Sequence, residues 1–111
     1  MRNATWMMLV VLPVLAACSR EIGDDCGSNS DCGSGRICDT SQPGGYCTIS
    51  PCRKGDCPSE SVCVTFQPES TWCMRECAKN EDCRVDYVCV LGFGDFPGFC
   101  DQVFADGSSK K

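Results

Sequence analysis

Cysteine is the residue type of this sequence whose number and spacing could do the most distinctive chemistry. The chain has 13 cysteines in 111 residues and no histidine. Structural zinc sites usually place cysteines two to four positions apart, whereas four or five residues stand here between neighbouring cysteines such as Cys26 and Cys32. Without histidine there is no Ser–His–Asp or Cys–His pair for catalysis. The pattern therefore predicts disulfides rather than a metal site, a cofactor or an enzyme, and disulfides persist only in oxidising compartments.

Twelve of the cysteines, between Cys26 and Cys100, form three copies of one unit. Each copy has an aspartate before its second cysteine (Asp31, Asp56 and Asp82). A β-branched residue precedes the third cysteine (Ile37, Val62 and Val88). An aromatic residue precedes the fourth (Tyr46, Trp72 and Phe99), and a proline lies between the third and the fourth (Pro43, Pro68 and Pro97). Repetition of this kind indicates tandem structural repeats.

Each unit is predicted to be a loop followed by a short β-hairpin. Segments such as "SVCVTF" and "STWCMR" have the β-branched and aromatic composition of strands, and the Pro- and Gly-containing stretch between them is a turn. The aromatic residue before the fourth cysteine is expected to pack across the β-branched residue before the third. The aspartates are expected to accept loop N–H groups; calcium binding is the alternative, although one aspartate per repeat supplies few of the oxygens that calcium needs.

If each unit is self-contained and all units are alike, three pairings of its four cysteines are possible. We favour the pairing of the first cysteine with the third and of the second with the fourth, because this ties the loop to both strands. The predicted disulfides are Cys26–Cys38, Cys32–Cys47, Cys52–Cys63, Cys57–Cys73, Cys77–Cys89 and Cys83–Cys100. Few leucine, isoleucine, valine and phenylalanine residues follow Cys18, so the cross-links replace most of an apolar core. The expected fold class is a small disulfide-rich protein of three tandem four-cysteine units.

The remaining cysteine, Cys18, follows one basic residue, Arg2, and a short apolar run from Ala4 to Ala17. The run is too short to span a bilayer and has the form of a secretory signal peptide. The residues "LAAC" resemble the lipobox of bacterial lipoproteins, which implies that Cys18 carries the lipid anchor and that the protein belongs to the bacterial cell envelope. Ser19 at the next position favours the outer membrane by the sorting rule of that family. An ordinary signal peptide with Cys18 as a spare thiol is the alternative.

The cysteine spacing and the Asp–Cys step resemble small Cys-rich repeats of extracellular bacterial proteins and, more distantly, the Dickkopf N-terminal domain and the EB module. The resemblance implies an extracytoplasmic location and little about activity. The expected domains are a signal peptide (1–17), the anchor cysteine with a spacer (18–25), the three repeats (26–51, 52–76 and 77–100) and a polar tail (101–111).

The predicted function is that of a lipid-anchored interaction or structural module without catalytic activity. A net charge of −5 argues against nucleic acid as a partner; the expected partners are the membrane, through the anchor, and an unknown protein or envelope component. The alternative is a secreted-type inhibitor that acts through a rigid loop at residues 90–99. Phe93 and Phe96 are the candidate binding residues of that loop, with packing onto their own hairpin as the alternative, whereas Phe99 is expected to be packed.

Overall fold

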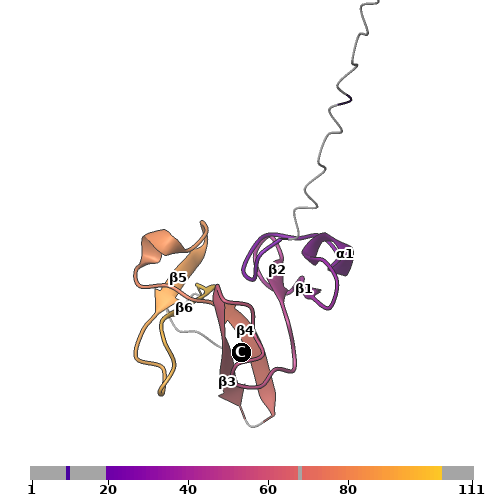
Figure 1. Cartoon of the computed structure of the whole chain (residues 1–111). Coiled ribbons are helices and arrows are strands. Elements are labelled where there is room, and N and C mark those ends of the chain that lie inside the picture. Colours follow the sequence, from indigo (N-terminus) through magenta and orange to yellow (C-terminus); the bar gives the residue numbers. More distant parts are fainter. Residues whose placement is uncertain (1–9, 11–19, 68, 104–111) are drawn as a thin grey trace, which may run out of the picture.

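The computed structural model describes residue 10, residues 20–67 and residues 69–103. The described part contains three two-stranded antiparallel hairpins, one in each repeat, and little helix (Figure 1). The elements in chain order are α1 (Asn29–Cys32), β1 (Ile37–Asp39), β2 (Tyr46–Thr48), β3 (Ser61–Gln67), β4 (Ser70–Arg75), the 3-10 helix η1 (Asn80–Asp82), β5 (Tyr87–Val90) and β6 (Phe99–Gln102). This architecture confirms the predicted fold class.

All twelve cysteines of the described part form disulfides, and each bond stays within one repeat. The bonds are Cys26–Cys38, Cys32–Cys47, Cys52–Cys63, Cys57–Cys73, Cys77–Cys89 and Cys83–Cys100, and this is the pairing expected from the sequence. The third and fourth cysteines of a repeat lie directly opposite each other in its hairpin, as Cys38 and Cys47 do. Each of them bonds a loop cysteine instead of its neighbour, so the loop is fixed to both strands. The closed loops have sequence separations from 11 to 17, and each bond of this size contributes about 3 kcal/mol in the chain-entropy model.

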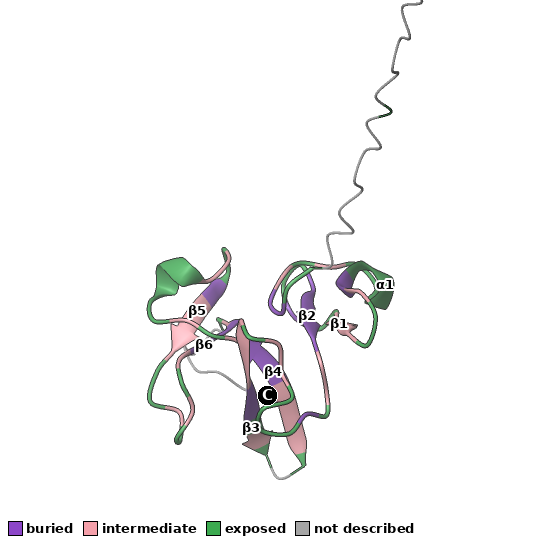
Figure 2. Cartoon of the chain, in the orientation of Figure 1, coloured by how far each residue is buried: buried purple, intermediate pink, exposed green. Residues whose placement is uncertain are grey.

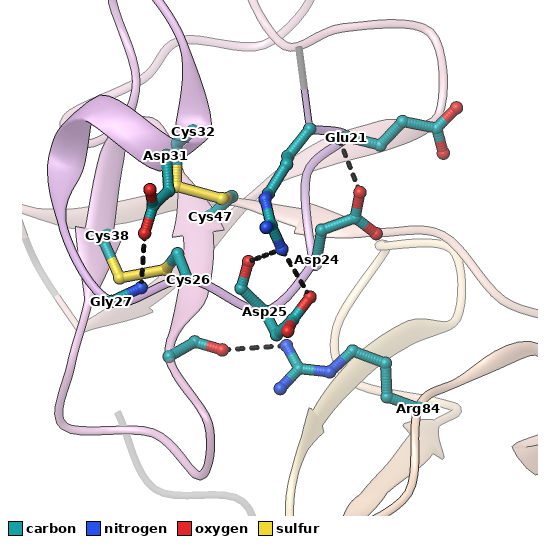
Figure 3. Close-up of polar contacts among 12 residues, drawn as sticks. Glu21, Asp24, Asp25, Cys26, Gly27, Asp31, Cys32, Cys38, Cys47 and Arg84 are labelled. Atoms are coloured by element: carbon teal, nitrogen blue, oxygen red, sulfur yellow. Dashed lines mark hydrogen bonds and ion pairs between the residues drawn. A yellow bond between two sulfur atoms is a disulfide. The ribbon is translucent and has the colours of Figure 1, made fainter. Parts of the chain in front are cut away.

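The aspartate before the second cysteine organises the loop in the first and third repeats. Asp31 accepts hydrogen bonds from the N–H groups of Gly27 and Ser28, at 2.8 and 3.1 Å, beside the two disulfides of its repeat (Figure 3). Asp82 accepts the equivalent bonds from Ala78 and Lys79, at 2.9 and 3.2 Å. These N–H donors lower the pKa of both carboxyl groups. In these two repeats the capping role predicted from the sequence is confirmed.

The second repeat departs from this arrangement. Its loop "CRKGDC" is one residue shorter than "CGSNSDC" and "CAKNEDC". The shorter loop lacks the asparagine whose side chain accepts the N–H of the third cysteine in the other repeats, as Asn29 does from Cys38 and Asn80 from Cys89 at 2.9 Å. No side-chain hydrogen bond of Asp56 to another described residue is present. This loop is therefore held by its disulfides, by its backbone and by the hydroxyl of Thr71, which accepts the N–H of Cys52 at 2.9 Å.

The aromatic residue before the fourth cysteine is expected from the sequence to pack directly across from the β-branched residue before the third cysteine. The hairpin register shows that this expectation is wrong. Because the third and fourth cysteines face each other, the residue before one of them lies opposite the residue after the other. Tyr46 is thus opposite Asp39, and Ile37 is opposite Thr48. The same offset recurs in the second repeat, where Trp72 faces Val64. The β-branched and aromatic residues of one repeat are diagonal neighbours, not direct partners.

The three repeats pack against one another around the hydroxyl group of Tyr46. This side chain is 1% exposed. Its hydroxyl accepts the N–H of Arg75 at the end of β4, at 2.9 Å, and donates to the carbonyl oxygen of Cys100 in β6, at 3.0 Å. One side chain of the first repeat therefore makes hydrogen bonds to the other two. Burial raises the pKa of Tyr46 well above its ordinary value.

Arg84 and Tyr87 of the third repeat extend this junction. The guanidinium of Arg84 donates to the carbonyl oxygens of Gly23, Gly45 and Pro43, at 2.8 to 2.9 Å, and Figure 3 shows this side chain extending toward the first repeat. The hydroxyl of Tyr87 donates to Pro43 as well, at 2.7 Å. The Arg84 guanidinium also lies 4.6 Å from the centre of the Tyr87 ring, a cation–π contact. The first and third repeats, which are far apart in the sequence, are thereby joined.

Two predicted boundaries need correction at their described ends. Residues 20–25, expected to be a spacer, belong to the folded body: Ile22 is fully buried, and the backbone of Gly23 and Asp24 is hydrogen-bonded to Cys47. Residues 101–103, assigned to the polar tail, continue the third repeat, because β6 ends at Gln102 and Asp101 is fully buried. The rest of both segments, including the signal peptide, Cys18 and Ser19, lies outside the described residues.

The core is small, and sulfur contributes much of it. Half of the buried apolar residues of the described part are disulfide cysteines. The others are Ile22, Tyr46, Val64, Met74, Tyr87 and Phe99, which come from the leading segment and from all three repeats. Figure 2 shows the burial concentrated where β2, β4 and β6 approach one another, whereas η1 and most of α1 are exposed. Cross-links hold each unit together, and this shared core joins the units.

Candidate binding groove between the second and third repeats

The loop between β5 and β6 carries the candidate binding residues. Phe99 is fully buried, as expected, whereas Phe93 and Phe96 are half-buried. The base of the loop lies close to the chain at Cys77, whose N–H donates to the carbonyl of Gly98 at 2.9 Å. A Cβ atom at Gly98 would stand 2.4 Å from the Cys77 carbonyl oxygen, so only glycine allows this approach. The loop is thus fixed at its base next to a disulfide.

The aromatic rings of this loop pack on the second repeat as well as on their own hairpin. The ring of Phe93 lies 5.6 Å from that of Phe99 and 5.8 Å from that of Phe66 in β3. A shift of register between Thr65 and Gln67 leaves Phe66 without a partner on β4, and such bulges redirect side chains. The ring of Phe96 stacks on the outer side of Phe93, at 6.3 Å. Phe93 is therefore a bridge between repeats, and Phe96 is the outermost ring of the cluster.

A groove of about 710 Å³ lies beside this cluster. One wall is the loop 52–57 of the second repeat, and the opposite wall is formed by residues 95–97 of the third. The floor consists of β3 residues and Thr71 of β4. Figure 1 shows the 91–98 loop on the β3 side of the hairpin, away from the linker that runs along β4. The volume falls in the range of ligand-binding sites.

The wall of the groove at residues 52–57 is positively charged. Arg53 and Lys54 are exposed, and neither side chain forms an ion pair or a hydrogen bond with another described residue. Asp95 on the opposite wall is the negative group among the lining residues. Arginines elsewhere in the described part are engaged, as in the 2.6 Å ion pair of Arg75 with Glu21. Arg53 and Lys54 therefore form an adjacent pair of uncompensated positive charges on a protein whose net charge is −5.

A second cavity, of about 300 Å³, lies at the junction of the repeats. Its walls include both tyrosines, Arg75 and Arg84, together with carboxylates such as Glu21 and Asp82. These groups already make the hydrogen bonds that join the repeats. The cavity is a polar space next to a structural junction, and the groove is the better candidate for a binding site.

The sulfur atoms offer no thiolate to a metal in this state. Among the described residues, the groups of three or more possible metal ligands are triplets of cysteines, one in each repeat. All of these sulfurs belong to disulfides, so they are neither nucleophiles nor good ligands. Cys18, the predicted lipidation site, lies outside the described residues.

The described part of the chain contains no helix that is both long enough and apolar enough to cross a bilayer.

No family model, curated protein or solved structure matches this chain. The six disulfides nevertheless indicate an extracytoplasmic location, because such bonds persist in oxidising compartments.

The sequence pattern predicted Phe96 on one wall of the groove as a binding residue, but it did not predict Arg53 and Lys54 on the other wall. Phe93 and Phe96 attracted notice because three phenylalanines occur within a short glycine-rich loop. Arg53 and Lys54 carried a signal that was available, because the loop between the first two cysteines of their repeat is one residue shorter than its counterparts. The role of Phe66 depends on a bulge, which the sequence does not reveal.

Proposed function

We propose that this protein is a non-catalytic binding module of the bacterial cell envelope, which holds a protein partner in the groove between its second and third repeats. The observation that carries the proposal is the half-buried ring of Phe96, fixed on a disulfide-stapled frame at the edge of that groove. A preformed aromatic edge lowers the ordering cost of binding.

The proposal includes a lipid anchor at Cys18. The "LAAC" motif supports it, and so does the pairing of the other cysteines: six disulfides use twelve of the 13, which leaves Cys18 without an intramolecular partner. One residue, Ser19, separates Cys18 from Arg20, where the folded body begins. In Figure 1 the described segment begins beside the first repeat, and the 91–98 loop points the other way. An anchor there leaves the groove open to a partner.

The alternative function, a secreted-type inhibitor, requires a loop that protrudes. In this structure the 91–98 loop packs against the second repeat, through the contact between the rings of Phe93 and Phe66. The surface that it helps to form is concave. This geometry favours a groove that receives a partner over a loop that enters one.

Photo-crosslinking tests the binding site. We would place a photoreactive amino acid at Asp95, which is exposed on the groove wall, and irradiate cells that export the protein. The expected result is one discrete crosslinked envelope protein, lost on Phe96→Ala. Leu91→Ala is the matched control, because Leu91 is 64% exposed in the same loop but does not line the groove. Equal crosslinking in both variants, or a smear without a discrete product, would contradict the proposed site.

Labelling with a fatty acid tests the anchor. The labelled chain should carry the fatty acid, and Cys18→Ser should abolish the label while the six disulfides still form. Label that persists in Cys18→Ser would show that the anchor is not at this residue.

A further inference from the structure

The two edges of the β3–β4 hairpin differ in how their backbone groups are used. The outer edge of β4 is covered by the linker between the first two repeats. There the N–H of Cys73 donates to Ile49 at 3.0 Å, and its carbonyl accepts the hydroxyl of Thr48 at 2.8 Å. The carbonyl of Thr71 accepts the hydroxyl of Ser50 at 2.7 Å. The edge of β4 is therefore closed.

The register then shows which groups of β3 face outward. In an antiparallel pair, opposite residues either exchange both hydrogen bonds or direct both groups away from each other. Cys73 directs its groups to the linker, so its opposite residue, Cys63, directs its own N–H and C=O away from β4. Thr65, opposite Thr71, does the same. Neither residue makes a backbone hydrogen bond to another described segment.

These outward-facing residues are the ones that line the groove. Cys63 and Thr65 both contribute to its floor. The groove also includes Val62, whose side chain points to the other face of the hairpin. Because residues from both faces of the β3–β4 hairpin line the groove, the groove extends around the edge of β3. The free edge of β3 thus lies in the groove, with Arg53 and Lys54 on one wall and Asp95, Phe96 and Pro97 on the other.

We propose that the groove binds an extended peptide segment with alternating acidic and apolar residues, which adds as a third strand to the edge of β3. This inference rests on the proposed function and specifies the class of partner. The backbone of the segment pairs with Cys63 and Thr65, as in other cases of strand addition. Because side chains alternate along a strand, one set faces Arg53 and Lys54, and the other faces Val62 and Phe96. Carboxylates suit the first set, and apolar groups the second.

The test uses the exported, oxidised protein labelled with ¹⁵N and three synthetic probes. The first probe is an acetylated, amidated octapeptide of alternating valine and glutamate. In the second, lysine replaces glutamate; in the third, every second backbone amide of the first is N-methylated. We expect the first probe to shift the amide resonances of Cys63 and Thr65 and to slow their hydrogen exchange. The lysine probe and the N-methylated probe should each bind at least about tenfold more weakly, because charge and strand pairing are lost respectively.

Variants of the protein test the basic wall. Arg53→Gln combined with Lys54→Gln should weaken the glutamate probe by roughly threefold to tenfold, the range expected for two exposed ion pairs. Lys79→Gln is the control, since it removes an exposed positive charge that does not line the groove. Added salt should weaken binding to the unmodified protein more than to the double variant.

Several results would overturn the inference. Equal binding of the glutamate and lysine probes would exclude charge recognition, and equal binding of the N-methylated probe would exclude strand addition. If none of the probes binds, the segment has a different chemistry. If vesicles containing phosphatidylglycerol perturb the groove and the peptide does not, its ligand is lipid. In each case a discrete crosslink at Asp95 that depends on Phe96 would leave the proposed function standing, whereas loss of that crosslink would remove both.

Discussion

Replacing Tyr46 with phenylalanine removes one hydroxyl group and leaves the ring in place. The hydroxyl makes two hydrogen bonds, one with the N–H of Arg75 and one with the carbonyl of Cys100, at 2.9 and 3.0 Å. A buried hydrogen bond between neutral groups contributes about 1 kcal/mol, and a partner left unsatisfied in the interior costs about 1–3 kcal/mol. If no water molecule replaced the hydroxyl, the loss in free energy of unfolding would therefore approach the upper part of that range for each of the two partners.

Water reduces this cost at the Tyr46 site. The polar cavity of about 300 Å³ is lined by Tyr46, Arg75 and Cys100 themselves. A water molecule in the vacated space can bond both groups, since the site is polar and has room for it. We therefore expect Tyr46→Phe to lower the free energy of unfolding by about 2 kcal/mol.

Tyr87→Phe is the matched control for this experiment. It removes the same group from a tyrosine that is 5% exposed, but its hydroxyl makes one hydrogen bond, to the carbonyl of the exposed Pro43. Its expected cost is about 0.5–1 kcal/mol. Both values come from guanidinium unfolding with the disulfides intact, and hydrogen exchange at the amide of Arg75 reports the junction directly. If the two variants lose equal stability and the Arg75 amide exchanges at the wild-type rate in Tyr46→Phe, the repeats are not joined through this hydroxyl.

Three further measurements examine the junction and the loops. Arg84→Lys keeps the charge but loses the planar group that reaches three carbonyls, so the free energy of unfolding should fall by about 1–2 kcal/mol; an unchanged value would contradict this role. Tyr46 and Tyr87 are the two tyrosines of the chain, and burial raises both pKa values, that of Tyr87 to about 12. The stability that burial of the neutral tyrosines confers is fully present below the unfolded pKa of about 10 and is lost as pH rises through the folded pKa values. Phenolate absorbance should therefore appear near pH 10 in the unfolded chain and about two units higher, or later, in the native protein. Loop N–H groups lower the pKa of Asp31 and that of Asp82. The stability that they confer on the loops is therefore present above the ordinary pKa of 3.8 and is lost as pH falls through the lower pKa of the folded state. The resonances of the bound amide protons should follow this titration, and a midpoint at 3.8 would contradict the role of the two aspartates.

The repeated features of the sequence describe the interior of a repeat well. The cysteine spacing leads to the hairpins and to loops fixed on both strands, and Asp31 and Asp82 accept the N–H groups expected of them. Such features are local: they depend on residues a few positions apart, and three copies show the same pattern. Asp56 departs from it because its loop lacks one residue, a difference that is visible in the sequence.

The contacts between repeats could not be predicted in the same way. They depend on residues that occur once, such as Arg84, which reaches a turn about 40 positions earlier, with separations of 39 to Gly45 and 41 to Pro43. An arginine after the second cysteine has no counterpart in the first repeat, where Gly33 occupies that position, and its partners are backbone carbonyls that any sequence supplies. Ile22 carried a weak signal, as an apolar residue within a charged segment, but nothing in the sequence showed which surface would bury it.

The aromatic residue before the fourth cysteine shows how a repeated position acquires different uses. Tyr46 extends its hydroxyl to both other repeats. Phe99 has no polar atom to extend and is fully buried against Phe66 of the second repeat, 5.6 Å between ring centres. Trp72 stays half-buried, with its ring N–H donated to the nearby Ser70 at 2.9 Å. Since the hairpin geometry presents all three residues alike, the differences arise from what each repeat packs against. Identical residues across repeats thus point to the internal architecture of a unit, and residues that differ at equivalent positions point to the surfaces by which the units join and, in the loop at Arg53 and Lys54, to the surface that we propose binds a partner.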